Sequence, residues 1–177
     1  MPVSRTIEAR GGMLVAHDGS ADADRALRTA VRLAAALGVH VSVVRAWSVS
    51  TAPRPDSWEP NFMPPFEDFE AATLVALDAD VQKVRIESPD VEIVTAVVHG
   101  APAEKLIDAS GSVDLVVVGS RGHGGFAGLR LGSVSEQVVR HAHCPVLVDK
   151  AAEGDEPVPV EKRQQMEDAL ASELNLD

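Results

Sequence analysis

Short apolar runs alternate with longer amphipathic segments along most of the chain. Five runs rich in Val, Leu, Ile and Ala predict strands, and they span residues 13–16, 39–47, 91–98, 115–118 and 145–148. Between them, apolar positions recur at helical spacing and predict helices over residues 22–37, over residues 66–88, and in two shorter stretches that begin at Pro102 and Ser133. The alternation of strands with helices predicts a parallel sheet.

The predicted fold class is therefore α/β, with a doubly wound, five-stranded parallel sheet and helices on both faces. Five strands leave no room for a second domain of similar size, so residues 1–150 are expected to form a single domain and residues 151–177 a C-terminal tail. In this topology the last strand, from Pro145 to Val148, lies at a sheet edge. Because an apolar edge invites pairing with a second copy, we expect a homodimer.

Two segments depart from this alternation. Residues 48–65 hold five prolines and no periodicity, so they predict a long loop that either covers a ligand as a lid or packs on a neighbouring subunit. In the tail, Met166, Leu170 and Leu174 follow one another at intervals of four and outline a thin apolar stripe. Either this segment is an amphipathic helix that docks on the domain or on a partner subunit, or it is a frayed, solvated tail.

The composition is that of a packed globular domain, with 45% hydrophobic and 24% charged residues. Aromatic residues make up only 3% and Tyr is absent, which suits a parallel sheet covered by helices. The net charge of -11 argues against binding of nucleic acid through its phosphates. Eight acidic and two basic residues lie in residues 151–177, so the tail carries -6 of this charge and the domain only -5.

Cysteine usage and hydropathy indicate a cytoplasmic protein. The single cysteine, Cys144, excludes an internal disulfide framework and a Cys-rich metal site. No apolar run approaches the roughly 20 residues that span a bilayer, and the N-terminus lacks the apolar core of a signal peptide. We therefore expect no membrane contact.

A glycine-rich stretch runs from the predicted strand that ends at Val118 to the predicted helix that begins at Ser133. In doubly wound sheets, ligands bind beyond the carboxyl ends of the strands, near the point where the strand order reverses. Glycines there allow backbone N–H groups to approach phosphate oxygens, and the first turn of the following helix favours an anion. The stretch is therefore a candidate phosphate site.

The spacing of these glycines is more specific than their number. Gly119, Gly122 and Gly132-Ser133 fit the pattern G-x2-G-x9-G-[S/T], so the chain resembles the ATP-binding universal stress proteins. The resemblance covers roughly residues 12–149 and includes Asp18-Gly19-Ser20 after the first strand, Gly100-x-Pro102-x-Glu104 before a helix, and the last strand. It implies a Rossmann-like fold of the adenine nucleotide alpha hydrolase-like type and the same homodimer.

The resemblance also implies a role for particular residues. The loop glycines and serines would hold phosphates and ribose, Asp18 would approach the ribose or the phosphate-bound metal, and the backbone of Ala46 would contact adenine. Mg²⁺ would arrive with the nucleotide. The implied site consists of Ala16, His17, Asp18, Ala46, Val118, Gly119, Arg121, Gly122, Gly132, Ser133, Val134 and Ser135. His17 is a departure, because relatives more commonly have a small or β-branched residue there.

Several of these assignments have a competing structural interpretation, in which the residue has no ligand. Asp18 is also suited to capping the first helix, and Ser133 and Ser135 to capping the last one without a ligand. Arg121 is typical of a solvated loop charge. His123 invites a catalytic interpretation, but no partner stands at a recognisable spacing, which favours a solvent-facing loop residue.

Three functions fit these observations. The first is a stress-response regulator that ATP or a related adenine nucleotide, cyclic AMP included, switches between states or partners. The second is a slow Mg²⁺-dependent ATPase or phosphotransferase; the chain has no G-x4-G-K-[S/T] motif and no assignable base, so efficient catalysis is not expected. The third is an interaction module that no longer binds nucleotide, against which the intact glycine pattern counts.

Overall fold

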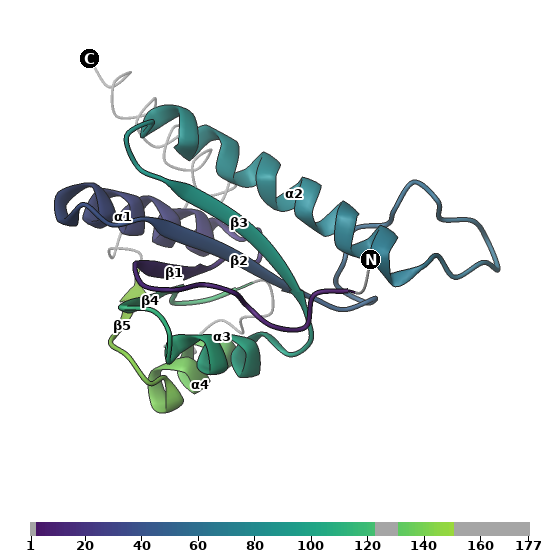
Figure 1. The fold of residues 1–177 in the computed structure, drawn as a ribbon. Coiled ribbons are helices and arrows are strands. Elements are labelled where there is room, and N and C mark those ends of the chain that lie inside the picture. Colours follow the sequence, from purple (N-terminus) through teal and green to yellow (C-terminus); the bar gives the residue numbers. More distant parts are fainter. Residues whose placement is uncertain (1–2, 123–130, 151–177) are drawn as a thin grey trace, which may run out of the picture.

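A computed structural model describes residues 3–122 and 131–150 and contains five strands and four helices in strict alternation (Figure 1). The strands are β1 (Met13–Ala16), β2 (Val41–Trp47), β3 (Ile93–His99), β4 (Leu115–Gly119) and β5 (Val146–Asp149). The helices are α1 (Ala21–Leu37), α2 (Phe66–Glu87), α3 (Pro102–Ser110) and α4 (Ser133–His141). The predicted tail helix and His123 lie outside the described residues.

All five strands are parallel and stand in the order β3-β2-β1-β4-β5. The central strand β1 pairs with β2 on one side and β4 on the other, with Leu14 opposite both Ser42 and Val116. The chain therefore moves outward in one direction up to β3 and then crosses to the other side of β1. The predicted α/β class, five-stranded parallel sheet and edge position of the last strand are confirmed.

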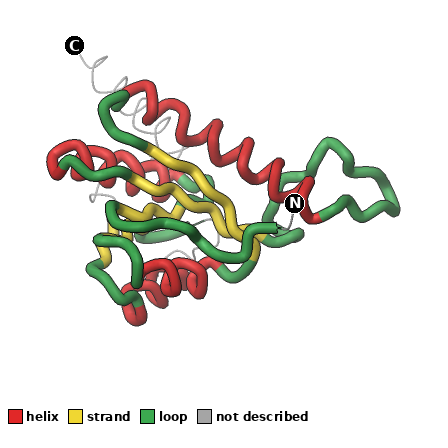
Figure 2. Tube along the Cα trace, in the orientation of Figure 1, coloured by secondary structure: helices red, strands yellow, loops and turns green. Residues whose placement is uncertain are grey.

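The helices lie in two layers, one on each face of the sheet, as the sequence predicts (Figures 1 and 2). α1 and α2 cover one face, where Leu27 and Leu77 are fully buried against strand residues such as Val43. α3 and α4 cover the other, where Leu106 and Val138 pack in a second apolar cluster. Burial of these apolar faces on a Val-rich sheet is the main stabilising term of the fold.

Helix α1 shows why the sequence predicts its boundaries well. The side chain of Ser20 accepts a hydrogen bond of 3.2 Å from the backbone N–H of Ala23, so Ser20 is the N-cap. At the other end Gly38 adopts a left-handed conformation, with φ of 67°, and its N–H donates to the carbonyl of Ala34. Glycine is the residue that adopts this conformation at least cost.

Two strands begin later than the sequence predicts. The predicted second strand includes Val39, but its N–H donates to the carbonyl of Ala34 and completes the end of α1, so β2 starts at Val41. The predicted third strand includes Val91, but its N–H donates to Ser88 in a turn. The side chains of both residues are apolar and pack against the core. Their backbone N–H groups, however, bond within turns and not within the sheet.

The last strand is shifted by one residue, to Val146–Asp149, relative to the prediction of residues 145–148. Pro145 has no N–H to donate, so only its carbonyl takes part in pairing, where it accepts from Val116. At the other end Asp149 lies opposite Gly119 and remains in the strand. Its carboxylate is buried by contacts with α1, which explains a charged residue at this position.

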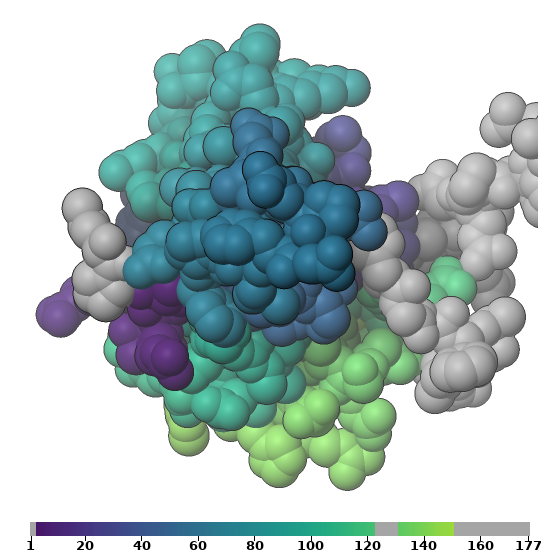
Figure 3. Space-filling model, turned by 90° about the vertical axis from the view of Figure 1, so that its right-hand side faces the viewer, coloured from purple at the N-terminus to yellow at the C-terminus, as the bar shows by residue number. Residues whose placement is uncertain are grey.

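The proline-rich segment 48–65 is a long loop that projects from the end of β2 and faces the viewer in Figure 3. Trp58 packs edge-on against Phe69 of α2, with ring centroids 6.2 Å apart, whereas Phe62 and Met63 are exposed. The two predicted roles of this loop, lid or subunit contact, stay predictions. None of the helices in the described part of the chain is long and apolar enough to cross a bilayer.

The buried face of α2 provides a direct test of the fold. Replacing the fully buried Leu77 by alanine leaves a cavity under α2 and is expected to lower the free energy of unfolding by about 2–5 kcal/mol. The matched control is Val75→Ala, on the same helix but 70% exposed, with an expected change within about 0.5 kcal/mol. Urea denaturation followed by circular dichroism measures both, and equal effects would contradict the orientation of α2.

Candidate functional site

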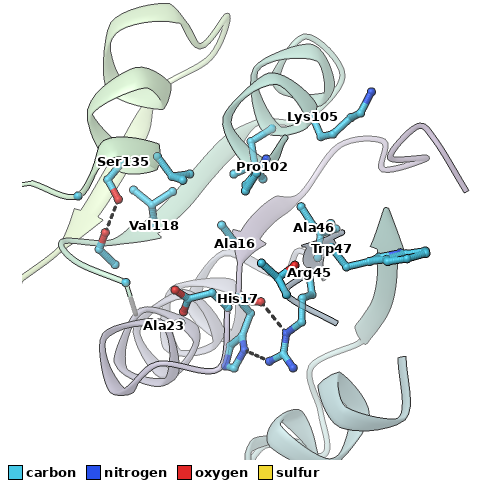
Figure 4. A pocket seen from close by; sticks show the side chains of 18 of the residues that line it. Ala16, His17, Ala23, Arg45, Ala46, Trp47, Pro102, Lys105, Val118 and Ser135 are labelled. Atoms are coloured by element: carbon cyan, nitrogen blue, oxygen red, sulfur yellow. Dashed lines mark hydrogen bonds between the residues drawn. The ribbon is translucent and has the colours of Figure 1, made fainter. Parts of the chain in front are cut away.

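A cavity of about 830 Å³ opens at the carboxyl ends of β1, β2 and β4 (Figure 4). Its walls come from the ends of these three strands, the first turns of α1, α3 and α4, and the glycine-rich segment. It lies at the point where the strand order reverses between β1 and β4, which is where ligands bind in doubly wound sheets.

The structure brings all the predicted site residues together around this one cavity. It is lined by Ala16, His17, Asp18, Ala46, Val118, Gly119, Arg121, Gly122, Gly132, Ser133, Val134 and Ser135. Other lining residues were not predicted, notably Arg45, Trp47 and Lys105. Arg45 had a signal in the sequence, as a charge inside an apolar strand, and Lys105 directly follows Glu104 of the predicted strand-to-helix junction.

One of the loop glycines is required by close packing against a backbone. A Cβ on Gly119 would lie 2.9 Å from the backbone carbon of Asp22 in α1. A Cβ on Gly122 would meet the carboxylate of Asp18, the end of a side chain that can turn away. Neither position has a positive φ, so the constraint at Gly119 is steric and not conformational.

Gly132 differs from these two glycines. Among the described residues, a Cβ at this position would meet only ordinary van der Waals contacts, the nearest at 3.5 Å from the Cα of Arg121, and its φ of -70° suits any residue. Neither its backbone conformation nor packing against the described residues therefore requires glycine here. A bare backbone that the protein does not itself need is expected where a ligand approaches closely.

Helix α4 begins at this glycine without a side-chain cap. The alternative that Ser133 or Ser135 caps this helix is therefore wrong. The hydroxyl of Ser135 instead donates 2.6 Å to the carbonyl of Gly119 and so ties α4 to the end of β4. Within the described residues, no acceptor is recorded for the backbone N–H groups of Ser133, Val134 and Ser135. These donors and the positive end of the helix dipole favour an anion.

The start of the loop is anchored by Asp22, which the sequence pattern identifies only as a helix residue. Its Oδ2 accepts from the hydroxyl of Ser120 at 2.9 Å and from the N–H of Arg121 at 3.0 Å. Arg25 lies 3.1 Å from its other oxygen and also bonds Asp149 at 2.7 Å. Burial alone would raise the pKa of Asp22, but the hydrogen bonds from Ser120 and Arg25 and the charge of Arg25 outweigh it and hold the pKa below its ordinary value.

Asp18 is not the cap of α1, so that alternative is wrong. Ser20 caps the helix, and the carboxylate of Asp18 accepts from the N–H of Ser20 at 3.0 Å. Its second oxygen lies against Gly122 across the loop. Asp18 therefore stands between the end of β1 and the glycine-rich segment, on the wall of the cavity.

The end of β2 presents backbone groups to the cavity. The carbonyl of Val44 accepts from His17 on the β1 side, and the carbonyl of Trp47 accepts from Gly100 on the β3 side. Because successive residues of a strand direct their N–H and C=O to opposite sides, both groups of Ala46 point to the β1 side. There β1 has already ended, since its last residue, Ala16, pairs with Val44.

His17 and Arg45 form the polar wall beside Ala46, and the dashed lines of Figure 4 mark their two bonds. Arg45 lies 3.0 Å from the carbonyl of His17 through Nε and 2.9 Å from its Nδ1 through a terminal nitrogen. Arginine can only donate, so Nδ1 accepts, and Nε2 carries the proton that it donates to Asp24 at 3.0 Å. Burial, with Arg45 nearby, lowers the pKa of His17 and keeps it neutral.

Two more groups complete the cavity. The indole N–H of Trp47 is buried and has no acceptor among the described residues. Lys105 folds over Gly100 and pairs with Glu104 at 3.2 Å. No cluster of three or more His, Cys, Asp or Glu side chains suited to a metal ion occurs in residues 3–122 and 131–150.

The chain resembles known proteins over most of its length. The model of the universal stress protein family matches residues 11–150. Universal stress protein Rv2005c of Mycobacterium tuberculosis is 36% identical over 149 residues, which cover 77% of this chain and 44% of that protein. The chain thus spans about half the length of the curated relatives it matches.

The fold also matches solved structures. Universal stress protein UspA from Lactobacillus plantarum superposes with a TM-score of 0.60 at 25% identity and covers 80% of this chain and 99% of that one. A universal stress protein in complex with cAMP has a TM-score of 0.59 at 24% identity, covering 81% and 98%. A family protein from Arabidopsis thaliana with AMP bound has a TM-score of 0.56 at 18% identity, covering 87% and 99%.

The packing of Gly119 on α1 predicts a loss of stability on substitution. Gly119→Ala forces the end of β4 away from Asp22 and is expected to lower the free energy of unfolding by about 1–3 kcal/mol. Gly111→Ala is the control, because its φ is -70° and the nearest atom to its Cβ lies 3.9 Å away. It should be neutral or stabilising by up to about 1 kcal/mol. Denaturant melts that fail to separate the two variants would refute the contact.

The depressed pKa of Asp22 predicts a pH-dependent contribution to stability. A carboxyl with a lowered folded pKa stabilises the protein above its unfolded value, near 3.8, and this contribution is lost as the pH falls through the lower folded value. Asp22→Asn is expected to cost about 1–3 kcal/mol at neutral pH, and the difference from wild type should shrink below pH 3.8. Denaturant midpoints at several pH values measure this; a difference that does not change with pH would contradict it.

Proposed function

This chain belongs to the universal stress protein family, and from that premise we propose that it is a regulatory protein that binds an adenine nucleotide, ATP included, in the cavity between β1, β2 and β4. Members of the family have been solved with cAMP and with AMP. The nucleotide would switch the conformation or the partners of the protein during stress.

The base would lie at the end of β2. The N–H and C=O of Ala46 form a donor and acceptor pair directed into the cavity, which matches the acceptor and donor on one edge of adenine. Apolar side chains of Val44, Leu106 and Val118 line the same cavity and would cover the faces of the ring. Asp18 would accept a hydrogen bond from the ribose.

The phosphates would lie between the glycine-rich segment and α4. The observation that carries the proposal is the uncapped start of α4, where backbone donors stand beside a glycine that packing against the described residues does not require. The described residues offer oxygen ligands singly and not as a cluster, so Mg²⁺ would bind with the nucleotide and take its ligands chiefly from phosphates and water.

The residues that line the cavity support a switch over an efficient enzyme. Phosphoryl transfer needs a group that positions or deprotonates the nucleophile. Both ring nitrogens of His17 are already hydrogen-bonded, one to Arg45 and one to Asp24. This histidine therefore cannot act as that base without losing one of these two hydrogen bonds. We propose in addition that two copies pair along the edge strand β5, whose Val146, Leu147 and Val148 are only half-buried.

Calorimetric titration of nucleotide-free protein with ATP and Mg²⁺ tests the proposal. Wild type should bind with one saturable site, and Gly132→Ala should bind at least about tenfold more weakly, because the new methyl group takes the space that a phosphate approaches. Gly111→Ala, distant from the cavity and equally free of strain, should bind as wild type does.

The controls decide what a negative result means. Neither variant should unfold below the wild-type temperature, because neither Cβ meets a close contact among the described residues. Absence of binding by folded, nucleotide-free wild type would overturn the proposal and leave a nucleotide-free interaction module. If Gly132→Ala binds ATP as tightly as wild type does, the phosphates do not lie at the start of α4.

A further inference from the structure

His17 and Arg45, the polar wall of the cavity, connect four segments of the chain: the end of β1, β2, α1 and α2. The guanidinium of Arg45 in β2 bonds the carbonyl and the Nδ1 of His17, and a terminal nitrogen also bonds Asp80 of α2 at 2.6 Å. The other ring nitrogen of His17 bonds Asp24 of α1. The side chain of His17 is fully buried and that of Arg45 is 12% exposed, so the bonds between these two residues are largely shielded from water, whereas Asp24 and Asp80 are 43% and 40% exposed.

This network fixes the backbone immediately before Asp18. The N–H of His17 donates to Val44 at 2.9 Å, and its carbonyl accepts from Arg45 at 3.0 Å. A peptide unit is planar, so holding the carbonyl of His17 also sets the position of the N and Cα of Asp18. From there the carboxylate reaches the N–H of Ser20 on one side and Gly122 on the other.

We propose that Arg45 is a positioning residue that, through His17, holds Asp18 at the distance and angle needed to bind a ribose hydroxyl, and so sets the preference of the site for ribonucleotides. This inference rests on the proposed function. Arg45 bonds the carbonyl of His17, the residue before Asp18. Asp80 holds the guanidinium of Arg45 to α2, and Asp24 holds the ring of His17 to α1. A lysine at position 45 keeps the charge but cannot make the same two bonds to His17.

The test compares nucleotides that differ in one group. Affinities of ATP, 2′-deoxyATP, 3′-deoxyATP and AMP are measured by calorimetry for wild type and for Arg45→Lys. Wild type should prefer ATP over at least one deoxynucleotide by about tenfold or more, as expected for a hydrogen bond to a charged group. In Arg45→Lys the ratio of the ATP affinity to the deoxynucleotide affinity should fall towards one. The ratio of the ATP affinity to the AMP affinity should not change.

Two further kinds of variant separate positioning from general damage. Arg85→Lys is the matched control: Arg85 joins Asp78 of α2 to Thr95 of β3 on the same face of the sheet, outside the cavity. It should keep the wild-type preference. His17→Asn places an acceptor near Nδ1 and should keep the preference, whereas His17→Leu should lose it.

The outcomes distinguish the two proposals. No binding of any nucleotide by folded wild type would overturn the proposed function and this inference together. Binding without discrimination between ATP and both deoxynucleotides, or equal losses in Arg45→Lys and Arg85→Lys, would overturn the inference alone. If Arg45→Lys does not fold, the comparison of His17→Asn with His17→Leu tests the inference, and equal preferences in those two variants would refute it.

Discussion

The contact between the first turn of α1 and the start of the glycine-rich segment is the constraint on which the cavity depends. Gly119 brings the end of β4 so close to α1 that a methyl group would meet the backbone of Asp22. The carboxylate of Asp22 then holds Ser120 and Arg121. Because α1 follows β1 after a short turn, this contact fixes the carboxyl ends of both central strands relative to each other.

The same contact places a carboxylate beside a site proposed for phosphates, in a chain whose net charge is -11. Asp22 is compensated locally, since Arg25 and two hydrogen-bond donors satisfy both of its oxygens. Attraction for an anion must then come from oriented backbone groups at the start of α4 and not from net charge. A local arrangement of dipoles explains how an acidic protein can present an anion site.

The sequence predicted most of the fold because periodicity reports burial: in α2 the apolar residues that recur at helical spacing, such as Phe69 and Leu77, are the buried ones. Strand ends were less accurate, because apolar residues such as Val39 are covered without pairing in the sheet. The glycines of the site were found through their spacing, and one of them, Gly119, marks a close approach of the loop to α1. Charged residues that act through distant partners left no such signal. Asp22 meets Arg121 across about a hundred positions of sequence, and an acidic residue in a first helical turn is favoured by the helix dipole whatever else it does.

Around the cavity, the ionisable side chains have hydrogen-bond partners within the protein, whereas several backbone groups have none among the described residues. This difference bears on the kind of residue found there. The ionisable groups of the wall, such as Arg45, His17 and Lys105, already have partners within the protein. The N–H groups at the start of α4 and both backbone groups of Ala46 have none recorded within the described part of the chain. A ligand that uses these groups must come within hydrogen-bond distance of the main chain, and large side chains would prevent it. If the proposed ligand binds here, it accounts for a small residue at Gly132 and Ala46, whereas Gly119 is small because it packs on α1. The large side chains of the wall act by holding the backbone in place.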